Sequence, residues 1–210
     1  DIELALDQLA TQLPHVKNVS IITSWFGTDL RCGNCEIKPG VETKTRITPE
    51  ATWRVSGVTR GSAYLVSQTE DGRPNYGGTP SDTSILQAIQ SLKSRGYQVT
   101  LYPFILMDVP SGNSLADPYG GAEQEAFPWR GRITCYPQSA ENTGAVNGQL
   151  NSFFGAAQSS DFSIENSVPN YSGTDEFSYR RFILHYAKLA QMAGGVDRFV
   201  IGSEMVGVTT

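Results

Sequence analysis

Apolar residues gather in a few short runs that are rich in β-branched and aromatic side chains. Two long runs cover residues 19–26 and 99–107, and shorter ones cover 63–67 and 199–201. Runs of this length and composition are typical of strands that are buried on both faces. The pattern therefore predicts four buried strands, in that chain order.

Helical periodicity appears between and around these runs. Apolar positions spaced three and four apart predict helices over 2–13, from 79 to about 95, and from 174 to 193. The second helix would begin with Thr79 as cap and Pro80 at its first position, and the third with acids at 174–176. Because a helix separates two buried-type strands, the order favours βαβ units, a parallel sheet and the α/β class.

Two irregular regions interrupt this order. Residues 36–43 alternate around Pro39-Gly40 and predict a hairpin, and residues 53–57 are expected to be extended. Residues 109–173 carry little pattern beyond a short strand at 132–136 and a short helix at 148–158. So long a connection inside a compact domain is usually functional. We expect Trp129 and Arg130 to be its contact residues.

Candidate chemistry lies at the strand ends. Glu204 follows the last strand, where catalytic groups of a parallel barrel sit; alternatively, it is a solvated residue that opens a loop. Trp25 ends the first strand with Asp29 nearby, so its ring would stack on a sugar or, equally well, close the core. His185 falls inside the last helix and is expected to be structural or exposed.

Composition narrows the classes of function. The chain has 210 residues, enough for one sizeable domain, with 18% charged residues and 21 glycines. Its net charge of −5 argues weakly against nucleic-acid binding, and no apolar run approaches the about 18–20 residues that span a bilayer. No signal segment opens the chain, and its start at Asp1 favours a piece of a longer protein.

Three cysteines leave several alternatives open. Cys32 and Cys35 form a C-x-x-C pair and Cys135 stands apart. Such a pair forms a redox couple, a tight disulfide or half of a zinc site. His15, His185 and Cys135 lack ligand spacing relative to the pair. A structural loop staple or plain thiols are therefore favoured, and we expect no metal and no cofactor.

Four stretches taken together resemble a known family. They are residues 24–35 (SWFGTDLRCGNC), 76–82 (YGGTPSD), 101–104 with 107–108 (LYPF and MD), and 199–204 (FVIGSE). In this order they resemble the glycoside-hydrolase TIM-barrel-like domain of tail hub proteins in gene transfer agents and related tailed phages. The resemblance covers nearly all of the chain. It implies a (β/α)8 TIM-barrel type of fold, present here as about the first four β/α units of a single domain, 1–210, truncated at its C-terminal end, with 109–173 as an insertion.

The resemblance also implies roles for single residues. In barrel glycosidases the acid/base Glu closes the fourth strand, which corresponds to Glu204 here, although Ser203 stands where those enzymes usually have Asn. The second carboxylate would lie on the seventh strand, outside this chain. Trp25, Tyr102 and Trp129 would stack on sugar. Asp108, at the end of the third strand, would bind sugar hydroxyls or orient Glu204; equally well, it caps a loop. A half barrel leaves open edges and an apolar face, so we expect either a fragment or copies that pair.

The resulting hypothesis is a glycosidase-like domain of a phage-tail-like particle made in the bacterial cytoplasm. It would act on or bind a cell-envelope polysaccharide, such as peptidoglycan, during DNA delivery. Its other partners would be tail and baseplate proteins, without direct contact to nucleic acid. The alternative is a non-catalytic structural or carbohydrate-binding barrel of the baseplate. A redox or zinc protein built on Cys32 and Cys35 is the third class.

Overall fold

The structure is a computed structural model that describes residues 2–47, 52–141 and 143–208. Its helices are α1 (Ile2–Gln12), α2 (Asp82–Ser94), α3 (Ala145–Phe154) and α4 (Tyr179–Met192). Its strands are β1 (Asn18–Gly27), β2 (Ile37–Lys38), β3 (Gly40–Val41), β4 (Arg54–Val55), β5 (Val58–Thr59), β6 (Tyr64–Leu65), β7 (Gln98–Met107), β8 (Phe162–Glu165), β9 (Val168–Tyr171) and β10 (Arg198–Phe199).

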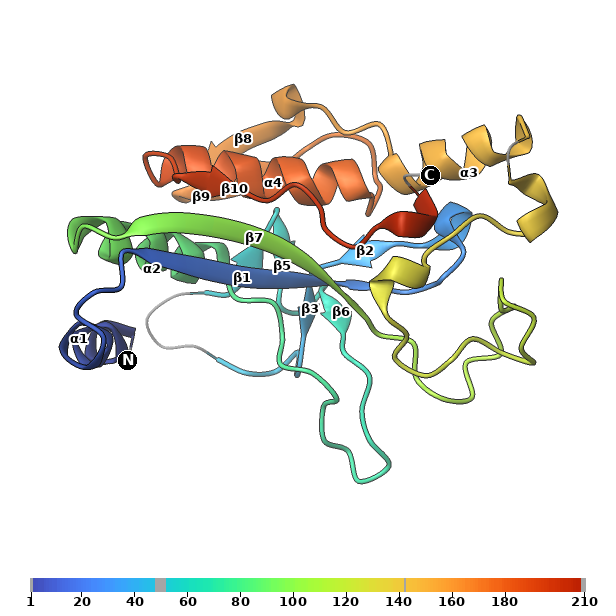
Figure 1. Ribbon diagram of the computed structural model, residues 1–210, viewed down its shortest axis with the longest axis horizontal. Helices are drawn as coiled ribbons and strands as arrows, with labels where there is room; N and C mark the ends of the chain where they lie inside the picture. Colours follow the sequence, from blue (N-terminus) through green and yellow to red (C-terminus); the bar gives the residue numbers. More distant parts are fainter. Residues whose placement is uncertain (1, 48–51, 142, 209–210) are drawn as a thin grey trace.

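A four-stranded sheet with the order β10-β7-β1-β2 forms the centre of the molecule. β1 and β7 pair in parallel along their whole lengths, from Asn18 opposite Gln98 to Gly27 opposite Met107. Figure 1 shows these two strands side by side, with α4 above them and with α1 and α3 at opposite ends. β10 is also parallel to β7, whereas β2 is antiparallel to β1. The predicted parallel α/β arrangement is confirmed for this sheet.

One face of the β1–β7 pair is the core of the molecule. Alternate residues of β7, among them Val99, Leu101 and Ile105, are buried there beneath α2 and α4. On β1 the Trp25 ring packs against Phe182 of α4, with 5.3 Å between centroids. The stripes predicted for α2 and α4 thus meet the sheet as amphipathic helices should.

The other face of the same strands is open along much of its length, and we call it the open face. The side chain of Ile22 is 61% exposed there, and Tyr102 and Phe104 are half-buried. Near the carboxyl ends, β6 and the loop after it cover the face, since Tyr64 and Tyr76 pack on Phe26. The prediction that these strands are buried on both faces is therefore wrong in the described residues, because no second layer closes over Ile22.

The predicted second strand, 63–67, does not join the central sheet. β6 pairs with β3 in a separate two-stranded sheet, and β1 lies directly beside β7. Asp108 at the end of β7 contacts this segment, since its carboxylate accepts hydrogen bonds from the backbone of Ser67 (2.8 Å) and the hydroxyl of Tyr64 (2.9 Å). These bonds hold the segment at the end of the sheet.

Three further strand predictions also need correction. Residues 36–43 form no hairpin, because β2 pairs with β1 and β3 with β6. The last strand ends at Phe199, beyond which Ile201 is exposed. The strand expected at 132–136 shrinks to one bridge between Arg31 and Thr134, whereas the extended region at 53–57 contains β4, paired with β5.

Both predicted helix starts lie a few residues too early. Ser81 caps α2 by accepting from the backbone N–H of Ser84, whereas Thr79 donates to the carbonyl of Ser24, 2.8 Å away. Ser178 caps α4. The acid expected in that cap, Glu176, instead accepts hydrogen bonds from the backbone N–H groups of Ala156 and Ala157, just after α3. Tertiary hydrogen bonds therefore decide which cap candidate is used.

The 109–173 connection is more ordered than its sequence indicates. It contains α3, which begins three residues before the predicted helix, and an unpredicted hairpin of β8 and β9. In the described part of the chain the strands form one four-stranded and three two-stranded sheets, and no closed barrel is present. Among the same residues, no helix is both long enough and apolar enough to cross a bilayer.

Candidate functional site

Glu204 lies in the segment that follows β10, on a backbone with a positive φ of +55°. Its carboxylate forms an ion pair with Arg130 and accepts a hydrogen bond from the indole N–H of Trp129 at 3.2 Å. The side chain of Glu204 is 53% exposed, whereas that of Arg130 is 5% exposed. The carboxylate is thus the outer partner of a buried cation.

Arg130 connects the insertion to the open face of the sheet. It begins a 3₁₀ turn, Arg130–Arg132, and its guanidinium carbon lies 3.7 Å from the centroid of the Phe104 ring on β7. Its Nη2 donates to the hydroxyl of Ser203 at 2.9 Å and, more weakly, to that of Tyr102 at 3.4 Å. The hydroxyls of Tyr102 and Ser203 also bond to each other.

These residues form one polar group, which we call the Glu204 cluster: Tyr102, Trp129, Arg130, Ser203 and Glu204. Three separate segments contribute to it, namely β7, the 109–173 connection and the segment after β10. Of the residues proposed from the sequence, Tyr102 and Trp129 therefore lie beside Glu204. Half-exposed Trp129 offers a ring, and Arg130 and Glu204 offer both charges at one place.

Trp25 and Asp108 lie elsewhere. Trp25 is fully buried on the helix side of β1, where the ring of His185 is 5.5 Å away, so it has no free face for a sugar in this structure. Its position is that of the alternative, a tryptophan that closes the core. Asp108 is buried and bonded to Tyr64 and Ser67; burial and the Asp108 charge together raise the pKa of Tyr64.

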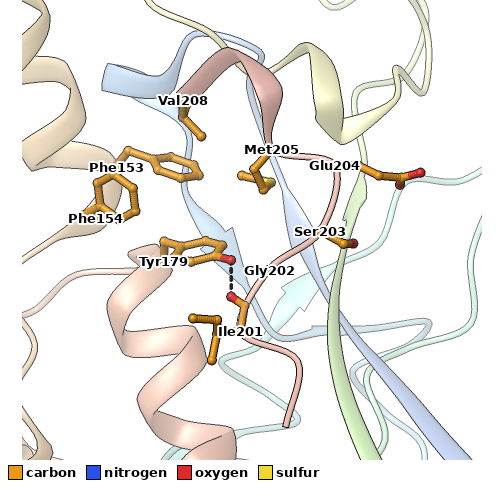
Figure 2. Close-up of a pocket in the computed structure, with 9 residues that line it drawn as sticks. All are labelled: Phe153, Phe154, Tyr179, Ile201, Gly202, Ser203, Glu204, Met205 and Val208. Atoms are coloured by element: carbon orange, nitrogen blue, oxygen red, sulfur yellow. Dashed lines mark hydrogen bonds between the residues drawn. The ribbon is translucent and has the colours of Figure 1, made fainter. Parts of the chain in front are cut away.

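An apolar pocket of about 380 Å³ adjoins the segment that carries Glu204. Figure 2 shows the rings of Phe153, Phe154 and Tyr179 facing this pocket, while the side chains of Ser203 and Glu204 point away from it. The hydroxyl of Tyr179 donates to the carbonyl of Ile201 and so ties α4 to the same segment. The pocket and the carboxylate thus lie on opposite sides of one stretch of backbone.

The three cysteines are free thiols in buried positions, so the C-x-x-C pair is not a disulfide staple here. Burial is the main cause that raises the pKa of Cys32 to about 11 and that of Cys35 to about 12. Within the described ranges, no group of three or more His, Cys, Asp or Glu side chains is arranged to hold a metal ion.

His185 is structural, which was one of the two expectations for it. The ring is fully buried in α4, and its Nε2 lies 2.9 Å from Oδ1 of Asp82 in α2, at ion-pair distance but outside hydrogen-bond geometry. The second oxygen of Asp82 accepts from the backbone of Ser56 at 3.1 Å. This contact joins α2 and α4 on the core side of the sheet.

The sequence pointed to Arg130 only as a contact residue of the insertion and did not pair it with Glu204. Tyr102 and Phe104 are two positions apart on one strand, so the alternation of side chains places both on one face. That signal was available from the sequence. The partner that joins them, Arg130, approaches from a connection without periodicity, and nothing local in the sequence indicates its direction.

Comparison with known families gives a match for the C-terminal part of the chain. The family model described as the GTA TIM-barrel-like domain matches residues 177–210, which include α4, β10 and Glu204. The C-terminal part of the chain is thus similar to a domain of the gene transfer agent family. The comparison with curated proteins gives no match for this chain.

Proposed function

We propose that this chain is a barrel-related domain of a gene-transfer-agent or phage-tail particle that acts on or binds a cell-envelope polysaccharide at the Glu204 cluster. One observation carries the proposal. A carboxylate, a guanidinium, a half-exposed indole and two hydroxyls meet beside the middle of β7, just after the end of β10 and on the open face. Aromatic rings and paired polar groups of this kind recognise the apolar faces and the hydroxyls of sugars.

In the catalytic form of the proposal, Glu204 is the general acid/base. Glycoside hydrolysis requires an acid that protonates the leaving oxygen and a second carboxylate that attacks the sugar or activates water. Tyr102 and Trp129 would position the sugar ring, and Arg130 would position Glu204. By the resemblance, the second carboxylate would come from a later strand that is not in this sequence.

A binding module without catalysis is the second candidate, and a specific observation favours it. The contacts of the Glu204 cluster within the described residues include one carboxylate, and that carboxylate is held by Arg130 and Trp129. Such an arrangement can bind a ligand without the second carboxylate that hydrolysis requires. The match to the GTA TIM-barrel-like domain supports a place in the particle for either candidate, with tail and baseplate proteins as neighbours.

The decisive experiment measures reducing-end release and binding on purified envelope glycans. It compares the protein in its full natural length with its Glu204→Gln and Glu125→Gln variants. Glu125 is the matched control, because it is an exposed acid paired with Arg132 in the same connection. Catalysis predicts release that Glu204→Gln abolishes and Glu125→Gln preserves.

A binding module predicts that no reducing ends are released. The protein is instead retained on the glycan, and Glu204→Gln or Trp129→Ala changes that retention. Protein that neither releases reducing ends nor is retained on envelope glycans would overturn the proposal in both forms.

A further inference from the structure

The two partners of the ion pair in the Glu204 cluster have very different surroundings. Arg130 is covered by Phe104 and the surrounding chain, and its side chain is 5% exposed, whereas Glu204 is 53% exposed. A guanidinium in such a position must keep an acceptor, because a buried charge without a partner is costly. The carboxylate that serves it, however, lies at the surface on a flexible side chain.

Among the described residues, the Glu204 carboxylate contacts the side chains of Arg130 and Trp129. Its φ of +55° is a left-handed conformation that residues other than glycine seldom adopt and that costs energy when they do. Only the Glu204 side of this ion pair faces solvent, so what Arg130 requires is an acceptor at this position, whichever molecule supplies it. A carboxylate from another molecule can therefore take over this position without disturbing the core of the protein.

The donors that converge here match a carboxylate group. Arg130 contributes Nη2, Trp129 contributes its indole N–H, and both reach the same oxygen of Glu204. The hydroxyls of Ser203 and Tyr102 accept from the same Nη2 of Arg130. Guanidinium and N–H donors arranged around an acceptor-only group are the usual protein receptor for a carboxylate.

We propose that Arg130 and Trp129 form a receptor for the carboxylate of an acidic sugar, and that Glu204 occupies this receptor as an internal substitute in the free protein. The ligand class is a glycan whose sugars carry a carboxylate, either a hexuronate or a carboxyalkyl ether of an amino sugar. The proposal rests on the proposed function only in taking the ligand to be a glycan. When the ligand carboxylate binds, Glu204 is released beside the sugar.

Released in this way, Glu204 becomes available for the role that the proposed function gives it. The net charge of −5 repels acidic polymers as a whole, so their recognition must come from a local site such as this one. Specific binding of an acidic sugar therefore depends on Arg130, and a neutral sugar of the same shape leaves Glu204 where it is.

The test measures binding by calorimetry, with glucuronate, muramate, the neutral methyl ester of glucuronate and inorganic phosphate as probes. Glu204→Gln removes the internal competitor. If that competitor occupies the receptor in about nine molecules of ten, its removal tightens glucuronate or muramate binding about tenfold, because only the vacant fraction is competent. Glu125→Gln, at the matched exposed ion pair with Arg132, leaves the affinity unchanged.

Tryptophan fluorescence locates the site in the same titration. Trp25 and Trp53 are buried and Trp129 is half-exposed, so a ligand-induced change reports on Trp129. Arg130→Lys weakens carboxylate binding, and Glu204→Gln provides the readout if the Arg130 variant does not fold. The arm that binds, glucuronate or muramate, identifies the source of the carboxylate.

Three results overturn the inference: a Glu204→Gln variant that binds acidic sugars no more tightly than the unaltered protein, a methyl ester that binds as well as the acid, or phosphate that binds better. These outcomes are independent of the proposed function. Tighter binding by Glu204→Gln without glycan hydrolysis supports the inference and overturns catalysis. Hydrolysis or retention that is the same for charged and neutral glycans supports the proposed function and overturns the inference.

Discussion

The two faces of the β1–β7 pair differ in how completely they are covered, although the same two strands form both. On the helix side, Val99, Leu101 and Ile105 are sealed beneath α2 and α4. On the open face, the equivalent alternate positions include exposed Ile22 and half-buried Tyr102. The same two strands therefore have a core side and a side that offers chemistry.

This difference separates stability from function within one sheet. The helix side contains large apolar groups whose burial favours folding at about 25 cal/mol per Å². The open face carries the Glu204 cluster, which is built on Tyr102 and Phe104 in the middle of β7 and on the segment that follows the carboxyl end of β10. In parallel α/β proteins, loops at the carboxyl ends of strands carry function while the sheet beneath carries stability.

The largest expected effect is on the helix side. Trp25→Ala removes a fully buried ring that packs on Phe182 and His185, and it should lower the free energy of unfolding by about 3–5 kcal/mol. Urea unfolding followed by circular dichroism measures this change. The matched variant on the open face, Trp129→Ala, should cost less than about 1 kcal/mol, because that ring is half-exposed. Equal losses at the two tryptophans would contradict the separation.

The contact between the two helices beneath the sheet should come next. Asp82→Ala leaves the buried backbone N–H of Ser56 without its acceptor and removes the ion-pair contact with His185, at a cost of about 1–3 kcal/mol. Asp71→Ala is the control, since its ion pair with Arg73 is exposed on both sides. Thermal and urea unfolding of both variants provide the comparison, and a neutral Asp82→Ala would show that the contact is not structural.

A third effect concerns pH. Burial raises the pKa of Cys35 to about 12 in the folded protein, whereas an unfolded cysteine titrates near about 8.5. The folded state thus binds the proton more tightly, and this contribution to stability is complete below about pH 8.5 and is lost as the pH rises toward 12. The expected loss is on the order of 1 kcal/mol per pH unit above about 8.5. Cys35→Ala should flatten the curve measured by urea unfolding from pH 7 to 10.

Much of the fold was predictable because its signals are local. β1, β7, α1, α2 and α4 follow from runs and periodicities that one segment contains by itself. The displaced segment at 63–67 was not predictable, because Asp108, more than forty positions away in the chain, accepts its hydrogen bonds. The open face was not predictable either, since an apolar strand has the same sequence whether or not a second layer covers it.

The candidate site divides in the same way. The rule that functional groups follow parallel strands led to Glu204, and the insertion after β7 led to Trp129. The pairing of Arg130 with Glu204 joins residues far apart in the chain and required the structure. Trp25 was misplaced among the ligand-binding residues because a strand end indicates position along the strand but not which face the side chain occupies.

The smallest expected effect is at the centre of the open face. Ile22 is 61% exposed, so Ile22→Thr, which keeps a β-branched side chain, should change the free energy of unfolding by less than about 0.5 kcal/mol. The measurement should be made at two protein concentrations tenfold apart. A loss near that of Trp25→Ala, dependent on concentration, would mean that a second copy of the chain covers this face in solution. Both sides of the sheet would then be core, and the distinction between a stable side and a reactive side would hold only near the Glu204 cluster.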